Sequence, residues 1–203
     1  MSAPGAAPLV VGIFVGGRGS RLGGVAKGLL KAPDSDTTLV ERLLQQLTRA
    51  APDAETVLVG SAEPYESLGQ RHIADQPSGI GPLGGLLGLL AFARQRGSTT
   101  ALVLACDLPR LDAAIITRLL NECPEAHAFV AEQAGVHNPL IARYATEPAL
   151  LAARHVLQDG QRSLQAVLEL LQPHVACLRL SAVEAAVLDD WDEPSDMQDE
   201  KPK

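Results

Sequence analysis

The sequence predicts an α/β fold of three layers, with helices on both faces of a mostly parallel (mixed) β-sheet. Three observations support this prediction. Short apolar segments such as Leu9–Val15 and Ala101–Ala105 have the composition of strands that are covered on both faces. Longer amphipathic segments alternate with them, as in repeated strand–helix–strand units. The chain has 203 residues, 46% of them hydrophobic and 20% charged, which suits one domain with a substantial core.

The first strand–helix–strand unit occupies the amino-terminal part of the chain. Leu9–Val15 is its first strand, and Gly16–Lys31 is a loop rich in glycine and basic residues. Thr38–Ala50 is predicted to be a helix because its leucines and valine form one stripe, opposite glutamate, arginine and glutamine. Glu55–Gly60 is a short apolar strand that completes the unit.

The same alternation continues toward the carboxyl terminus. Further helices are predicted at Leu83–Arg94, Asp112–Glu122 with Asp112 as N-cap, Pro148–Gln158 and Ser163–Leu171. Further strands are predicted at Arg71–Ile73, Ala101–Ala105, Phe129–Ala131, Asn138–Tyr144, Val175–Leu180 and Ala185–Leu188. Because no repeat or linker interrupts this order, we expect a single domain over residues 1–192 and a polar, flexible tail over residues 193–203.

The charge distribution argues against a nucleic-acid partner. The net charge is −7, and the seven acids and two lysines of residues 189–203 account for −5 of it, which leaves −2 for the rest of the chain. Polynucleotide binding needs basic surface and stacking aromatic residues, whereas the sequence pI is about 5.2 and only 3% of the residues are aromatic. We therefore expect no nucleic acid among the partners.

Cysteine usage and the lack of targeting segments predict a cytoplasmic protein. Cys106, Cys123 and Cys177 are odd in number and show no Cys-x-x-Cys spacing, so neither a disulfide framework nor a thiolate zinc site is indicated. The five histidines are scattered without metal-ligand spacing, and we assign none of them a catalytic role. The first apolar run lacks the basic segment of a signal peptide, and the uncharged stretch Gln76–Ala93 is broken by prolines and glycines. No membrane association is expected.

The loop after the first strand is the main candidate for ligand binding, because open α/β sheets bind ligands beyond the carboxyl ends of their strands. Its glycines allow backbone N–H groups to approach a ligand. Four basic residues precede the first acid of the chain, namely Arg18, Arg21, Lys27 and Lys31. This charge cluster favours a polyphosphate ligand over an ordinary solvated turn, although neither the dinucleotide nor the Walker spacing is present.

A series of motifs extends over roughly residues 9–197. In order they are Gly16-Gly17-Arg18-x-Ser20-Arg21-Leu22-Gly23-Gly24-x-x-Lys27, Asp75, Gly81-Pro82-Leu83-x-Gly85, Cys106-Asp107-x-Pro109, Asn138-Pro139, Gly160-x-Arg162-Ser163 and Asp190-x-Asp192-x-Pro194. Together they resemble the nucleotidyltransferases of Rossmann-like fold, in particular the molybdenum cofactor guanylyltransferases. The resemblance implies transfer of GMP from GTP to the phosphate of molybdopterin or Mo-molybdopterin, release of pyrophosphate, and Mg²⁺ as cofactor. It also implies protein partners from cofactor biosynthesis or molybdoenzyme maturation.

The resemblance implies roles for individual residues as well. The implied catalytic residues are Lys27, Arg21 and Asp107, and the implied metal ligands are Asp107 and Asp192. Nucleotide contacts are implied for Phe14, Val15, Gly16, Gly17, Lys27, Asp75 and Asp107.

From the residues alone, each acid has a second interpretation. Asp107 follows an apolar strand, where a Mg²⁺ ligand and an aspartate that caps the next turn are equally consistent. A carboxylate at Asp75 can accept hydrogen bonds from the N1–H and N2–H₂ of guanine, or form a turn before Pro77. Asp192 is either a metal ligand or part of a solvated acidic tail.

Several positions depart from the pattern of the family. Ala26 and Gly60 stand where aspartate and asparagine are common, Asp190-x-Asp192 replaces Asn-x-Asn, and the loop Ala32–Thr38 is long. These departures bear on base contacts and acceptor specificity. They leave three alternatives open: cytidylyl transfer to the molybdenum cofactor, nucleotidyl transfer to a sugar phosphate, and a non-catalytic nucleotide-binding module.

Overall fold

The structure is a computed structural model that describes residues 8–16, 26–33, 35–61 and 63–191. Its strands are β1 (Val10–Phe14), β2 (Glu55–Val59), β3 (Arg71–Ile73), β4 (Thr100–Ala105), β5 (Ala128–Gln133), β6 (Val136–Ala145) and β7 (Val175–Arg179). Its α-helices are α1 (Leu39–Ala50), α2 (Pro82–Gln95), α3 (Ala113–Asn121), α4 (Thr146–Gln158), α5 (Leu164–Leu171) and α6 (Ala182–Ala185). Short 3₁₀ helices are η2 (Lys27–Leu29), η3 (Glu63–Leu68) and η4 (Ala186–Leu188). None of the described helices is long and apolar enough to cross a membrane.

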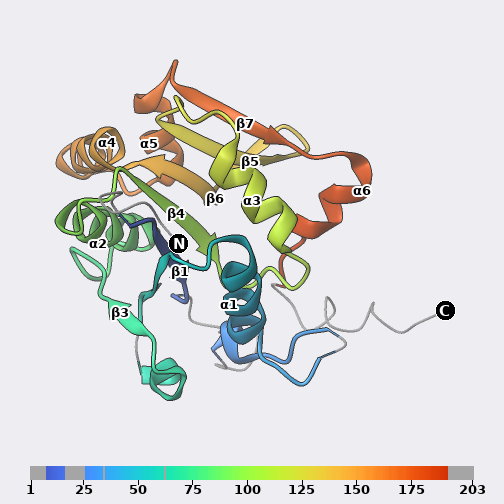
Figure 1. Cartoon of the computed structure of the whole chain (residues 1–203). Helices are drawn as coiled ribbons and strands as arrows, with labels where there is room; N and C mark the ends of the chain where they lie inside the picture. The colour runs from blue at the N-terminus through green and yellow to red at the C-terminus, as the bar shows by residue number, and fades with distance from the viewer. Residues whose placement is uncertain (1–7, 17–25, 34, 62, 192–203) are drawn as a thin grey trace.

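The seven strands form one mixed sheet in the order β3-β2-β1-β4-β6-β5-β7. β6 pairs antiparallel with β4 and β5, and all other described pairs are parallel. The sheet therefore runs from β3 at one edge to β7 at the other (Figure 1). β1 lies inside the sheet between β2 and β4, and all five of its residues are buried.

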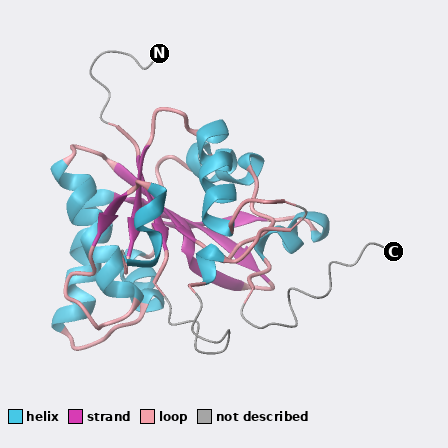
Figure 2. Ribbon diagram, turned by 90° about the horizontal axis from the view of Figure 1, so that it is seen from below, coloured by secondary structure: helices cyan, strands magenta, loops and turns pink. Residues whose placement is uncertain are grey.

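Helices cover both faces of the sheet (Figure 2). One hydrophobic cluster joins α2, α4 and α5 to residues such as Val103, Val130 and Tyr144. The other joins α1 and α3 to the opposite side of the same strands, including Leu102 and Leu104. Because adjacent strand residues point to opposite faces, each central strand contributes to both clusters. The predicted three-layer α/β architecture is confirmed.

Most of the described α-helices begin after a residue whose side chain caps the helix. Thr38 and Glu41 form a reciprocal capping box at α1. The predicted N-cap Asp112 accepts a hydrogen bond from the Ile115 N–H at 3.0 Å, and Ser163 caps α5.

The prediction of a strand at Ala185–Leu188 is wrong. This segment is the end of α6 followed by η4. Ser181 starts α6 with a capping box, in which its side chain accepts from the Glu184 N–H and Glu184 accepts from the Ser181 N–H. This local hydrogen bonding overrides the β preference of the following valine and leucine. The predicted tail, residues 193–203, lies outside the described residues.

Arg143, on β6, is a charged residue in the core with only 3% of its surface exposed. Its guanidinium donates hydrogen bonds to the carbonyl oxygens of Leu119, Leu120 and Cys123, at and beyond the end of α3. It also lies 5.6 Å from the centre of the Phe129 ring. Burial lowers the pKa of Arg143 from its usual value. The last carbonyls of a helix have no partner within the helix, so this side chain replaces water at a buried helix end.

We expect Arg143→Met to lower the free energy of unfolding by about 2–4 kcal/mol, because it leaves these carbonyls without donors. Urea denaturation followed by circular dichroism measures the effect. Arg154→Met, at an exposed position on α4, is the control and should change stability by less than about 0.5 kcal/mol. Equal stabilities for the two variants would contradict this role for Arg143.

Candidate active site

A cavity of about 680 Å³ opens at the carboxyl ends of β1, β2 and β4. Its lining comes from segments far apart in the sequence: the ends of these strands, η2, the segment after β3, the start of α2, and part of β6. Ligands of open α/β sheets bind at this edge. The position alone makes it the first candidate for a substrate site.

The structure brings together most of the residues singled out in the sequence. Six of them line the cavity, namely Phe14, Val15, Gly16, Lys27, Asp75 and Asp107. The other three, Gly17, Arg21 and Asp192, lie outside the described residues, and their roles stay predictions. Residues that have no role assigned from the sequence also line it, among them Asn138 and Asp190, which belong to the motifs, and Leu140.

Lys27 and Asp107 form an ion pair on the cavity wall. The Lys27 Nζ lies 3.1 Å from the Asp107 Oδ2, and the two side chains are 19% and 18% exposed. Because both side chains are mostly buried, their charges are screened less than those of a surface pair. The pair therefore places one cation and one carboxylate side by side on the cavity wall, groups that can contact a phosphate and a metal ion respectively.

A buried tyrosine fixes the backbone next to Lys27. The Gly28 N–H donates a hydrogen bond to the Tyr65 hydroxyl at 3.2 Å, and Tyr65 is 1% exposed. A Cβ on Gly28 would lie 2.4 Å from Val40 and 3.0 Å from the Tyr65 ring, so glycine allows η2 to pack against α1 and η3. Burial raises the pKa of Tyr65, which keeps its hydroxyl neutral. Lys27 thus extends from a backbone that is held by the core.

A second backbone contact places Asp190 beside Asp107. The Trp191 N–H donates to the Asp107 carbonyl oxygen at 3.0 Å, and the Trp191 side chain is buried against Ala32 and Leu39. The segment after η4 is therefore anchored next to the end of β4, and Asp190 and Asp107 line the same cavity. Asp192, which the resemblance implies as a metal ligand, lies outside the described residues, and its role stays a prediction.

Cys106 lies between β4 and Asp107 and is buried. Burial and the neighbouring Asp107 charge raise the pKa of its thiol to about 12. A neutral, buried thiol of this kind is a core group and not a nucleophile.

Glycines at the start of α2 bring the segment of Asp75 close to the helix backbone. A Cβ on Gly84 would lie 2.4 Å from the Pro77 carbonyl oxygen, and one on Gly85 would lie 3.3 Å from the Asp75 carboxylate. The Gln76 N–H donates to the Gly84 carbonyl at 2.9 Å. Asp75 is half-buried as a result, and this burial raises the pKa of its carboxyl.

Gly60 has a structural reason to differ from the asparagine of the family pattern. Its φ is +119°, and a Cβ there would lie 3.0 Å from the Gly16 nitrogen. Any side chain would strain this conformation and press on the loop after β1. Glycine at position 60, in place of the asparagine of the family pattern, is therefore explained by the close approach of its backbone to that of Gly16.

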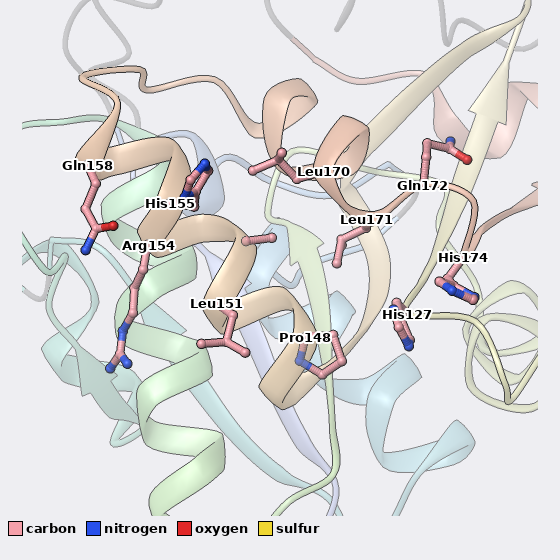
Figure 3. Close-up of a pocket in the computed structure, with 11 residues that line it drawn as sticks. His127, Pro148, Leu151, Arg154, His155, Gln158, Leu170, Leu171, Gln172 and His174 are labelled. Carbon is pink, nitrogen blue, oxygen red and sulfur yellow. The ribbon is translucent and has the colours of Figure 1, made fainter.

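A second cavity, of about 730 Å³, lies between α4 and α5 near the amino ends of β5 and β7 (Figure 3). Its lining includes His127 and His174, whose ring centres are 4.4 Å apart, together with Arg154, His155 and Leu151. Although it is slightly larger, its described lining contains no carboxylate, and it lies at the opposite end of the parallel strands. We therefore assign the site to the cavity of Lys27 and Asp107.

Comparison with known proteins shows the family to which the chain belongs. The family described as the MobA-like NTP transferase domain matches residues 11–183. A molybdenum cofactor guanylyltransferase of Pseudomonas syringae pv. syringae (strain B728a) is 34% identical over 173 residues, which cover 82% of this chain and 81% of that protein. The chain belongs to the molybdenum cofactor guanylyltransferase family. A probable member from Opitutus terrae is 30% identical over 98% of this chain and 97% of its own length.

Solved structures show that this guanylyltransferase-family chain shares its fold with other nucleotidyltransferases. Molybdopterin-guanine dinucleotide biosynthesis protein A from Archaeoglobus fulgidus superimposes with a TM-score of 0.71 at 22% identity, covering 94% of this chain and 95% of that one. A 2-C-methyl-D-erythritol 4-phosphate cytidylyltransferase from Thermus thermophilus gives 0.64 at 18% identity, covering 95% and 96%. At such identities the likeness concerns the fold alone. It gives no information on which base or acceptor the chain prefers, and that question has to be argued from the residues of the site.

Gly84→Ala tests the close packing under Asp75. Alanine normally stabilises a helix by about 1 kcal/mol relative to glycine. Here we expect the reverse, a loss of about 1–3 kcal/mol in urea denaturation, because the new methyl group overlaps the Pro77 carbonyl. GTP binding, measured by calorimetry, should weaken with it as Asp75 shifts. The control is Gln95→Ala at the exposed end of α2. An unchanged or more stable Gly84→Ala protein would show that the Asp75 segment has room to move.

Proposed function

We propose that this protein transfers GMP from GTP to the phosphate of molybdopterin or Mo-molybdopterin, giving molybdopterin guanine dinucleotide and pyrophosphate. The observation that carries the proposal is the single cavity that combines Asp75 with the Lys27–Asp107 pair. Asp75 offers a carboxylate suited to guanine, and the Lys27–Asp107 pair offers charges suited to phosphates and a metal ion. Family membership supports the same reaction.

In this proposal Asp75 recognises the base. Its half-buried carboxylate accepts hydrogen bonds from the N1–H and N2–H₂ of guanine, a donor pair that cytosine and uracil do not present in this arrangement. Hydrogen bonds to an ionised group in a partly desolvated place are stronger than hydrogen bonds between neutral groups. The backbone at Val15 and Gly16, which lines the cavity, would lie along the nucleotide between Asp75 and Lys27.

Lys27 is proposed to bind the phosphates of GTP. When the nucleotide binds, the Lys27 ammonium group contacts phosphate oxygens in place of, or in addition to, the Asp107 carboxylate. There it stabilises the negative charge that develops on pyrophosphate. The acceptor phosphate is already ionised at neutral pH, so an oxygen of that phosphate attacks the α-phosphorus directly as the bond to the β-phosphate oxygen breaks. No protein nucleophile and no general base are required.

The carboxylates of Asp107 and Asp190 fit a divalent metal of the Mg²⁺ type. Both line the cavity, both offer hard oxygen ligands, and Lys27 balances the charge of Asp107. When bound there, Mg²⁺ would supply further charge neutralisation for the phosphates of GTP. We propose Asp107 and Asp190 as its protein ligands. Asp192, the residue indicated by the motif, stays a prediction, as do the cytoplasmic location and the protein partners.

Product analysis tests the proposed reaction. The protein is incubated with molybdopterin, Mg²⁺ and GTP, CTP, UTP or ATP in turn, and the product is identified by mass spectrometry. We expect a GMP-capped product with GTP alone, and none after Mg²⁺ is chelated. A CMP-capped product would favour the cytidylyl alternative. Tight GTP binding without release of pyrophosphate would favour a non-catalytic nucleotide-binding module.

Lys27→Ala tests the phosphate contact. We expect kcat/KM for GTP to fall at least about tenfold, because loss of a charged hydrogen bond in a partly desolvated site costs ~1.5–3 kcal/mol. Stability should change little. Lys31→Ala is the matched control, since Lys31 is an exposed lysine paired with Asp36 at 2.7 Å. If both variants keep the kcat/KM of the parent protein, Lys27 has no part in transfer.

A further inference from the structure

Three neighbouring strands bring Glu132, His137 and Cys177 together, apart from the cavity described above. Their ligand atoms all lie within 4.8 Å of one another. The Cys177 Sγ is 3.1 Å from the His137 Nε2, and the Glu132 Oε2 is 3.6 Å from the same nitrogen. All three residues are partly covered.

The sheet register explains how the three side chains meet. Glu132 and His137 are opposite one another on β5 and β6, next to the turn at Ala134 and Gly135, whose φ values are +50° and +80°. Cys177 on β7 is opposite Val130, two residues before Glu132, so its side chain leaves the same face of the sheet. The cluster is therefore built on paired strands.

A contact from α5 holds His137 as well. The Gln165 side chain donates a hydrogen bond to the His137 carbonyl at 2.8 Å. The backbone at His137 is thus fixed by both the hairpin and the helix, which is the rigid support that a preorganised site needs.

We propose that Glu132, His137 and Cys177 form a binding site for a transition-metal ion of borderline softness, Zn²⁺ above all, with a fourth position open to water or a further ligand. A thiolate, an imidazole nitrogen and a carboxylate are the ligand types that Zn²⁺ takes in proteins. The oxygen donors of Asp107 and Asp190 suit Mg²⁺ instead, so the two sites select different ions.

The geometry separates this site from a Cys–His–Glu catalytic triad. In a triad the histidine contacts the nucleophile with one ring nitrogen and the acid with the other. Here the same nitrogen, Nε2, faces both Cys177 and Glu132, so the three groups converge on one point as metal ligands do. Burial and the Glu132 carboxylate also raise the pKa of the Cys177 thiol, which disfavours a free nucleophilic thiolate.

Metal binding at this site has a defined proton balance. The Cys177 thiol loses its proton as the metal–sulfur bond forms, so each bound ion releases a proton to solvent, with no change of oxidation state. The bound ion would tie the edge strand β7 to the β5–β6 hairpin. Asn138, directly after His137, lines the cavity of Lys27 and Asp107, so the same hairpin supports one wall of that cavity.

Titration with Co²⁺, a spectroscopic substitute for Zn²⁺, tests the proposal on the full chain after chelation and dialysis. We expect a thiolate-to-cobalt charge-transfer absorption that saturates at one equivalent and disappears when Zn²⁺ is added. Cys177→Ala should abolish this absorption, and His137→Ala should weaken Co²⁺ binding at least about tenfold. Cys123→Ala is the matched control, because Cys123 is a partly exposed thiol outside the cluster, and it should behave like the parent.

Three results would overturn the proposal: no charge-transfer absorption in the parent protein, the same absorption in Cys177→Ala, or loss of the absorption in Cys106→Ala, which would place the metal beside Asp107. Thermal unfolding gives a second measurement. Zn²⁺ at about a hundredfold excess over its Kd should raise the Tm of the parent by roughly 5 °C or more, and leave that of folded Cys177→Ala unchanged. Guanylyl transfer is not measured in either experiment, so the outcome is independent of the proposed function.

Discussion

The parallel pairing of β1 with β2 and β4 is the interaction on which the rest of the structure depends. Phe14, the last residue of β1, is level with Val59 on one side and with Ala105 on the other. Because parallel strands end at the same edge, the segments after all three emerge together. Gly16 therefore lies close to both Gly60 and the cavity wall of Asp107, although the sequence separates these residues widely.

Close backbone approach is the second requirement of the site. Gly28 lets η2 pack on Tyr65, Gly60 lets β2 end against Gly16, and Gly84 admits the segment after Asp75. In each case a methyl group would overlap a neighbour, so small size matters more than helix or strand preference. The backbone next to Lys27 and Asp75 is therefore closely packed, which favours a preorganised position for these two side chains.

The two candidate metal sites differ in the softness of their donors and in how the fold builds them. Asp107 and Asp190 follow the ends of elements and are joined through the Trp191 contact with the Asp107 carbonyl. Glu132, His137 and Cys177 lie within paired strands and meet through the sheet register. Oxygen donors beside a lysine suit an ion that shares its coordination with phosphates, whereas a thiolate and an imidazole retain a softer ion.

The sequence by itself determined the fold class, the order of most elements and the cavity residues Lys27, Asp75 and Asp107, because these depend on local apolar patterns and on short motifs. Tertiary structure decided the rest. Capping by Ser181 turned an apolar segment into a helix, and the hydrogen bond from Trp191 brought Asp190 to the cavity. Only the strand register brought Cys177 to Glu132 and His137. Cys177 is 40 or more positions from both residues, and no local sequence motif spans such a separation.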